Sequence, residues 1–150
     1  MDEITVTNTP NPGNTNLMKR KGASIIFIND RNQVLLFLRD DKPEIPYPNM
    51  WDVPGGHVEK DETPRECIIR EMKEEIDIEL KQFQFFKSYD FPDREEHMFW
   101  KKENLSINTI HLTEGQCMKW FTRQDARQTE LACGFNQIVE EFFMYFLNRL

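Results

Sequence analysis

This 150-residue sequence contains only three cysteines, too few and too widely spaced for a disulfide framework or a cysteine-rich zinc site. Cys67, Cys117 and Cys133 are odd in number, and no two of them form a C-x-x-C pair. We therefore expect reduced thiols in a cytoplasmic protein. We expect Cys67 to be a small buried residue, with a position beside the functional site as the alternative.

The sequence also lacks a block of positive charge and a long apolar run. Its net charge of −7 argues against nucleic acid or an anionic membrane surface as the main partner. No segment is typical of a transmembrane helix or a signal peptide, so we expect no membrane partner. Whether the chain forms a homodimer stays open.

The apolar pattern predicts one domain in which strands and helices alternate. Residues 1–19 are rich in Asn, Thr and Pro, and we expect an arm or tail there, followed by a single domain at 20–150. Short apolar or alternating runs predict strands at 23–28, 34–38, 51–54, 78–91, 97–101 and 118–121. Helices are expected after Thr63, at 124–131 and at 134–150. This order indicates an α/β fold with helices on both faces of a sheet.

Finer expectations concern the strands and the segments between them. The first two strands are expected to be buried on both faces, and prolines stiffen a loop at 40–49. In 78–91, alternation predicts Phe83, Phe85 and Tyr89 on one side of the strand. Residues 92–96 are expected to form a turn or loop.

The first helix has clear start signals and two distinct faces. Thr63 is a suitable N-cap, Pro64 suits the first helical position, and Glu66 completes a capping box. A buried stripe is expected at Ile69, Met72 and Ile76, and a separate acidic face carries Glu71, Glu74 and Glu75.

That acidic face is electrostatically unfavourable. Each like-charged pair one turn apart costs about 0.2–0.5 kcal/mol, and carboxylates near a helix C-terminus oppose the helix dipole. A hard divalent cation such as Mg²⁺ or Mn²⁺, which prefers oxygen ligands, would offset this repulsion. A solvated acidic face without a metal is the alternative, and spacing alone leaves both open.

The stretch from Gly56 to Ile78 resembles the Nudix box, Gly-x5-Glu-x7-Arg-Glu-U-x-Glu-Glu-x-Gly-U, where U is a bulky aliphatic residue. The matching residues are Gly56, Glu62, Arg70, Glu71, Met72, Glu74, Glu75 and Ile78. Six charged or glycine positions match by chance about once in 10⁷ starts if each residue type has its average usage. Asp77 departs from the pattern, since the family has glycine there. The helix is therefore expected either to run one residue further or to end with Asp77 in the left-handed conformation.

The resemblance implies a Nudix α/β/α sandwich, with a mixed β-sheet between helices, and a set of site residues. Glu71, Glu74 and Glu75 would bind Mg²⁺ or Mn²⁺, and Glu62 would bind metal through water or pair with a structural Arg70. Glu114 is a further catalytic candidate, and Glu95 and Glu96 are ranked after it for the same role. The substrate-binding candidates are Gly55, Gly56, His57, Tyr47 and Trp51. His57 could equally be exposed loop, and Trp51 could equally be core.

The resemblance also implies hydrolysis of the pyrophosphate bond in a nucleoside diphosphate linked to another group, by metal-activated water. Pro92 resembles a proline of ADP-ribose-cleaving members, which slightly favours ADP-ribose or a nucleotide sugar. An oxidised or ordinary nucleoside triphosphate is the alternative substrate. A non-catalytic nucleotide-sugar sensor is the alternative of another class, and a structural adaptor has no positive feature. Sensors usually lose box glutamates, and this sequence retains them all.

Overall fold

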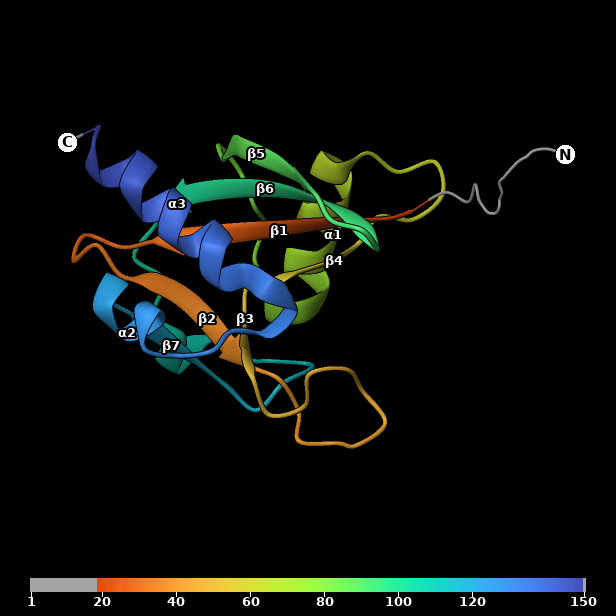
Figure 1. Ribbon diagram of the computed structural model, residues 1–150, viewed down its shortest axis with the longest axis horizontal. Helices are drawn as coiled ribbons and strands as arrows, with labels where there is room; N and C mark the ends of the chain where they lie inside the picture. Colours follow the sequence, from red (N-terminus) through yellow and green to blue (C-terminus); the bar gives the residue numbers. More distant parts are fainter. Residues whose placement is uncertain (1–18, 150) are drawn as a thin grey trace, which may run out of the picture.

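The computed structural model describes residues 19–149, which contain a seven-stranded mixed sheet between helices (Figure 1). The strands are β1 (Arg20–Ile28), β2 (Val34–Leu38), β3 (Trp51–Asp52), β4 (Gly55–His57), β5 (Gln84–Asp90), β6 (Arg94–Lys102) and β7 (Cys117–Phe121). The α-helices are α1 (Pro64–Ile76), α2 (Arg123–Arg127) and α3 (Phe135–Leu147), and short 3₁₀ turns are η1 (Ile107–Thr109) and η2 (Ala132–Gly134). Residues 1–18 of the arm predicted at 1–19, and Leu150 of the helix predicted at 134–150, lie outside the described residues.

The main path of the sheet runs β3-β2-β1-β6-β5, with β4 paired to β1 and β7 paired to β2. Strands β1 and β6 are parallel, and the other pairs are antiparallel. A mixed sheet was the predicted architecture, and it is confirmed. Strand β1 is buried from Gly22 to Ile28 because it lies in the middle of this sheet.

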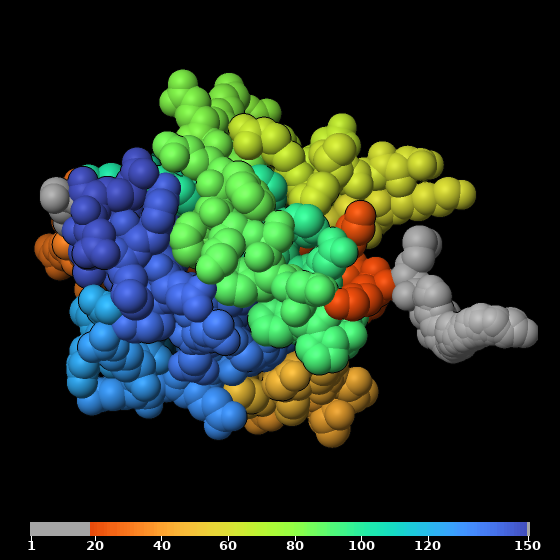
Figure 2. Space-filling model, turned by 45° about the horizontal axis from the view of Figure 1, so that its top comes forward, coloured from red at the N-terminus to blue at the C-terminus, as the bar shows by residue number. Residues whose placement is uncertain are grey.

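Each face of the sheet has its own hydrophobic core. Alternate residues of β1 point to opposite faces, so Ile25 and Phe27 pack with α1, whereas Ile26 and Ile28 pack with α3. The predicted amphipathic α3 buries an aromatic and aliphatic face made of Phe135, Ile138, Val139, Phe142, Phe143 and Phe146. Figure 2 shows the segment that contains β5, in green, running beside α3, in dark blue. Among the described helices, none is long and apolar enough to cross a membrane.

The buried stripe of α1 lies one residue away from the predicted one. Met72 and Ile76 are buried as expected, but Ile69 is 40% exposed and Ile68 is fully buried in its place. Ile68, Met72 and Ile76 are spaced by four residues, so they stack on the side that faces β1. The predicted placement of Ile69 was wrong by about one-quarter of a helical turn. Cys67 is fully buried, which supports its structural interpretation.

The segment at 78–102 also differs from the prediction. Strand β5 begins only at Gln84, and β6 begins at Arg94 inside the predicted loop. A bulge between Phe85 and Lys87 breaks the alternation of β5. As a result Phe83 and Phe85 pack against Phe99 on the α1 side, whereas Tyr89 packs in the α3-side core. The expectation that Tyr89 shares a side with the two phenylalanines was therefore wrong.

Both ends of α1 follow local sequence signals. The Thr63 hydroxyl accepts from the Glu66 amide, and the Glu66 carboxylate accepts from the Thr63 amide, which confirms the capping box. Asp77 ends the helix in the left-handed conformation, with φ 55° and ψ 44°. Its carboxylate accepts a 2.8 Å hydrogen bond from Lys73 one turn earlier. Of the two alternatives for this position, the left-handed residue is the observed one. Helix α2 is shorter than predicted and ends at Arg127.

Candidate functional site

The two glycines of β4 allow a strand and a helix to approach each other closely. A Cβ atom on Gly56 would lie 2.2 Å from the carboxyl carbon of Glu71, and one on Gly55 would lie 2.2 Å from the Ala23 carbonyl oxygen. Neither Gly55 nor Gly56 is among the residues that have a positive φ. The requirement for glycine at these two positions is therefore steric and does not come from a left-handed backbone conformation. Strand β4 pairs with β1 through Gly56 and Ala23, which holds it under the acidic face of α1.

Arg70 binds three of the motif glutamates. Its Nε and Nη2 atoms donate to the two carboxylate oxygens of Glu62 at 2.7 and 3.0 Å. Its Nη1 atom donates to Glu71 at 2.9 Å and to Glu74 at 3.2 Å. Hydrogen bonding to Arg70 lowers the pKa of Glu62 to about 2, and the same bond raises the pKa of Arg70. The observed pairing of Glu62 with Arg70 is one of the two predicted arrangements for Glu62.

Glu75 lies in a crowded acidic environment. Burial raises the pKa of Glu75 to about 9, and a hydrogen bond with Glu71 acts in the same direction. The charges of Glu114 and Glu74 add to this effect. The neighbouring carboxylates therefore favour the protonated form of Glu75, because a second full negative charge beside Glu71 is unfavourable.

The carboxylates around Glu75 suit a hard divalent cation in their chemistry. Contact between Glu71 and Glu75 requires either a shared proton or a positive charge, and all the donor atoms are oxygens. Within residues 19–149, no three His, Cys, Asp or Glu side chains are gathered as a bound metal ion would hold them. Instead, the Arg70 guanidinium supplies positive charge to Glu71 and Glu74. The residues therefore fit a hard metal ion by the chemistry of their donor atoms, while Glu71 and Glu74 are held by Arg70.

Glu114 belongs to a loop that is fastened to the end of α1. The Thr113 amide donates to the Glu75 carbonyl at 3.2 Å, and the Thr113 hydroxyl to the Glu74 carbonyl at 3.4 Å. Glu114 follows directly, is exposed, and contributes to the raised pKa of Glu75. The structure thus brings Glu114 near the predicted metal ligands.

Glu95 and Glu96, the candidates ranked after Glu114 for the same role, have other partners. Glu95 lies 3.4 Å from His97, and Glu96 is buried against Ser24 and Arg94. Both are in β6 and not in the predicted loop.

The predicted substrate-binding side chains lie in different environments. Trp51 is half-buried and packs edge-on against Phe121, with ring centroids 5.0 Å apart, which matches the core alternative for this residue. Tyr47 is 47% exposed in the proline-rich loop. His57 is exposed, and its Nε2 atom lies 3.1 Å from Arg20. Tyr47 and His57 are therefore accessible to a ligand, and Trp51 is largely not.

A second polar cluster, on the α3 side of the sheet, was not predicted. Buried Glu96 accepts from Ser24 and from Arg94, both at 2.8 Å, and buried Asp52 accepts from Arg39 at 3.0 Å. Burial raises the pKa of Asp52. The signal in the sequence that could have indicated this cluster is the presence of the polar residues Ser24 and Asp52 within apolar strand segments. The partner of Ser24 depends on the parallel pairing of β1 and β6, and the partner of Asp52 depends on the antiparallel pairing of β2 and β3, neither of which local patterns reveal.

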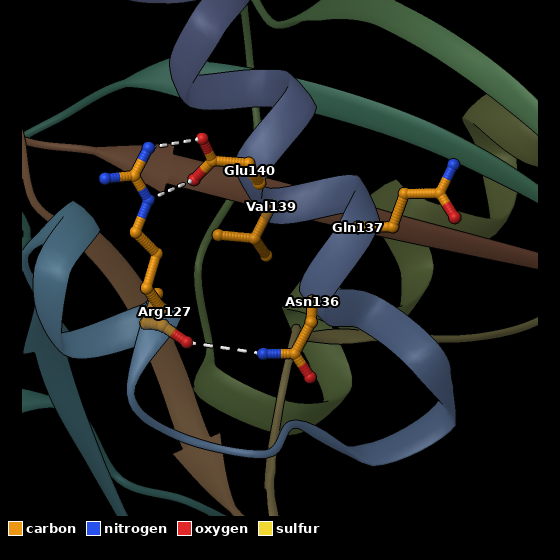
Figure 3. A pocket seen from close by; sticks show the side chains of 6 residues that line it. Arg127, Asn136, Gln137, Val139 and Glu140 are labelled. Carbon is orange, nitrogen blue, oxygen red and sulfur yellow. Dashed lines mark hydrogen bonds and ion pairs between the residues drawn. The ribbon is translucent and has the colours of Figure 1, made fainter.

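The pocket drawn in Figure 3 lies between α2 and α3 and has a volume of about 290 Å³. Its polar side chains are mutually paired: Arg127 binds Glu140 at 2.7 Å, and Asn136 donates to the Ala126 carbonyl at 3.3 Å. None of the predicted site residues lines it. It is therefore a gap in helix packing separate from the acidic site.

The family model of the NUDIX domain matches residues 18–142. The chain is 33% identical to an 8-oxo-dGTP diphosphatase of Escherichia coli strain K12 over 100 residues, which cover 65% of this chain and 75% of the relative. It is 32% identical to an RNA pyrophosphohydrolase of Marinomonas sp. strain MWYL1 over 108 residues, which cover 68% of this chain and 58% of that protein.

Solved structures show the same fold. A MutT structure from a study of the Aliivibrio salmonicida and Vibrio cholerae proteins has a TM-score of 0.71 at 22% identity, covering 85% of this chain and 99% of that one. The Escherichia coli ORF135 protein has a TM-score of 0.69 at 26% identity, covering 91% and 98%. With the family model matching most of its length, this chain belongs to the Nudix family and is MutT-like.

Proposed function

We propose that this protein hydrolyses a pyrophosphate bond in a small nucleotide, with Mg²⁺ or Mn²⁺ bound by Glu71, Glu74 and Glu75. The observation that carries the proposal is the contact between Glu71 and Glu75, because two half-buried carboxyls in contact need a shared proton or a cation. A bound divalent ion would neutralise phosphate oxygens and lower the pKa of a water molecule. The net charge of −7 opposes the binding of an anionic substrate, and such an ion would offset this repulsion.

The protein's own residues would have separate roles in this reaction. Arg70, anchored by Glu62, orients the Glu71 carboxylate. Gly56 leaves room for that carboxylate to lie against β4. Glu114 is the candidate to accept a proton from water or to add a further ligand, because its loop is held at the end of α1. His57 and Tyr47 are the candidates for phosphate and base contacts, since both are exposed.

A nucleoside triphosphate is the substrate class that we now favour. Relatives of this chain carry the names 8-oxo-dGTP diphosphatase, RNA pyrophosphohydrolase and CTP pyrophosphohydrolase. ADP-ribose or a nucleotide sugar is the second candidate. A structural neighbour, the NUDIX domain of Shewanella oneidensis NrtR, was solved with ADP ribose, at a TM-score of 0.68 and 15% identity, which is a likeness of fold alone. Pro92, between β5 and β6, was the feature that favoured this second class.

A substrate panel read by mass spectrometry tests the function. Nucleoside triphosphates, oxidised nucleoside triphosphates, ADP-ribose, nucleotide sugars and 5′-triphosphorylated RNA are incubated with the protein, with Mg²⁺ or with excess chelator. We expect Mg²⁺-dependent cleavage of a phosphoanhydride in at least one triphosphate, and water labelled with ¹⁸O then identifies the bond that breaks. Binding of a nucleotide without cleavage of any substrate would contradict the proposal and favour the sensor alternative.

A further inference from the structure

Arg70 is bound through two different edges of its guanidinium group. The Nε and Nη2 edge forms a paired contact with Glu62, and Nη2 also donates to the His57 carbonyl at 3.1 Å. Nη1 alone reaches the predicted metal ligands Glu71 and Glu74. A cation entering this site must therefore share these two carboxylates with an arginine that is already there.

We propose that Arg70 competes with the divalent cation, and that Glu74 leaves Nη1 for the cation while Glu62 keeps the guanidinium in place. This inference rests on the proposed function, because it uses the metal site of that proposal. The inference adds two roles to that function. Glu74 is the ligand that exchanges Arg70 for the cation, and the charge of Arg70 limits the affinity of the site for the cation.

The contacts of the three glutamates differ in a way that supports this order. The bonds from Arg70 to Glu62 and Glu71 measure 2.7–3.0 Å, and both carboxylates have side chains only 14% exposed. The bond to Glu74 is longer, at 3.2 Å, and its side chain is 60% exposed. An exposed ion pair contributes little to stability, about 0–1 kcal/mol. Glu74 can therefore leave Arg70 with the smallest loss.

The positive charge of Arg70 also repels the incoming cation directly. Even at the dielectric constant of bulk water, two unit charges about 4 Å apart interact strongly enough to change an affinity by roughly fivefold. Removing the charge should therefore tighten cation binding. The same change should slow hydrolysis, because Glu71 loses the group that orients it. A purely structural role for Arg70 predicts that both cation affinity and activity fall.

The first experiment measures Mn²⁺ affinity of the full chain by electron paramagnetic resonance of free Mn²⁺. For Arg70→Gln we expect roughly three- to tenfold tighter binding than for the wild type, with slower hydrolysis. For Arg70→Lys, which keeps the charge, the affinity should stay within about twofold. Lys73→Gln is the matched control, because it removes a charge from the same helix that pairs with Asp77 and not with the acidic site.

Two results would overturn the inference in distinguishable ways. If the wild type binds Mn²⁺ and folded Arg70→Gln binds it equally or more weakly, Arg70 does not compete, and the proposed function stands. If the wild type shows no Mn²⁺ binding and no metal-dependent hydrolysis, the metal site itself is wrong. Circular dichroism of each variant establishes that it is folded.

A second measurement needs no variant. Nuclear magnetic resonance of ¹⁵N-labelled arginine follows the Arg70 side chain of the wild type during a Mg²⁺ titration. We expect the Nη1 signal to shift, because Nη1 loses Glu74, and the Nε signal to change little, because it stays bound to Glu62. An unchanged Nη1 signal at saturating Mg²⁺ would show that no exchange occurs.

Discussion

Glu75 is the carboxyl whose charge depends most on what occupies the acidic site. Burial and the neighbouring Glu71 raise the pKa of Glu75, so a metal ion that binds there competes with a proton. Glutamine has nearly the same shape but cannot become an anion. We expect Glu75→Gln to lower the hydrolysis rate at least a hundredfold, about 2.7 kcal/mol of transition-state stabilisation, with the melting temperature unchanged or higher.

The rate is measured with the substrate identified by the panel, at saturating Mg²⁺. Glu79→Gln, at an exposed position just after the helix, is the control and should retain wild-type activity. A Glu75→Gln protein as active as the wild type would remove Glu75 from the set of ligands.

Gly55 and Gly56 are adjacent but should respond differently to alanine. At Gly56 the new methyl group meets the end of the flexible Glu71 side chain, so the carboxylate can move aside and the fold survives. We expect Gly56→Ala to lose activity tenfold or more at nearly wild-type stability, in line with the sensitivity of catalysis to small displacements. At Gly55 the methyl group meets the backbone of β1, and we expect a loss of about 1–3 kcal/mol in unfolding free energy.

Urea denaturation and activity assays on both variants check this contrast. Equal stability losses at the two positions, or a fully active Gly56→Ala protein, would contradict it.

At the scale of elements, α1 carries the acidic face and ends at an unusual residue. Asp77 has φ 55°, a conformation that glycine adopts freely and aspartate adopts at a cost. Asp77→Gly relieves that cost and loses the exposed pair with Lys73, which contributes only about 0.3–0.5 kcal/mol. We expect a gain of up to about 1 kcal/mol in unfolding free energy and unchanged hydrolysis.

The comparison variant is Asp77→Asn, which tolerates the same conformation and loses the ion pair, so it isolates the effect of the pair. A clear destabilisation by glycine, measured in urea, would show that the aspartate contributes more to this helix end than its exposed pair suggests.

At the scale of the whole molecule, Glu140 joins α2 to α3. Its carboxylate binds Arg127 (Figure 3) and also Arg123, and these hydrogen bonds lower the pKa of Glu140 to about 2. A lowered folded pKa means that this stabilisation is complete above about pH 4.5, the ordinary value of the group, and is lost as the pH falls through about 2. We expect Glu140→Gln to be less stable than the wild type at pH 6 and to approach it at pH 2.

Melting temperatures between pH 2 and 6 measure this difference, with the exposed Glu130→Gln as the control. A difference between Glu140→Gln and the wild type that does not shrink towards pH 2 would assign the stabilisation to packing and not to charge.

The sequence by itself determined the features that depend on residues close in the chain. The capping box, the crowding of Glu71 and Glu75 and the amphipathic α3 all follow from residues that recur about one helical turn apart. Local backbone geometry brings such residues together whatever the rest of the chain does.

Only the tertiary structure decided which charges meet and which residues face inward. The bulge that separates Tyr89 from Phe85, the placement of Ile68 in the stripe expected for Ile69, and the buried pair of Ser24 and Glu96 depend on neighbouring elements. Arg70 could pair with several nearby acids, and its two edges are assigned only when β4 and the Glu62 loop pack against α1. Contacts between distant segments are selected by the packing of the whole chain, which no local pattern contains.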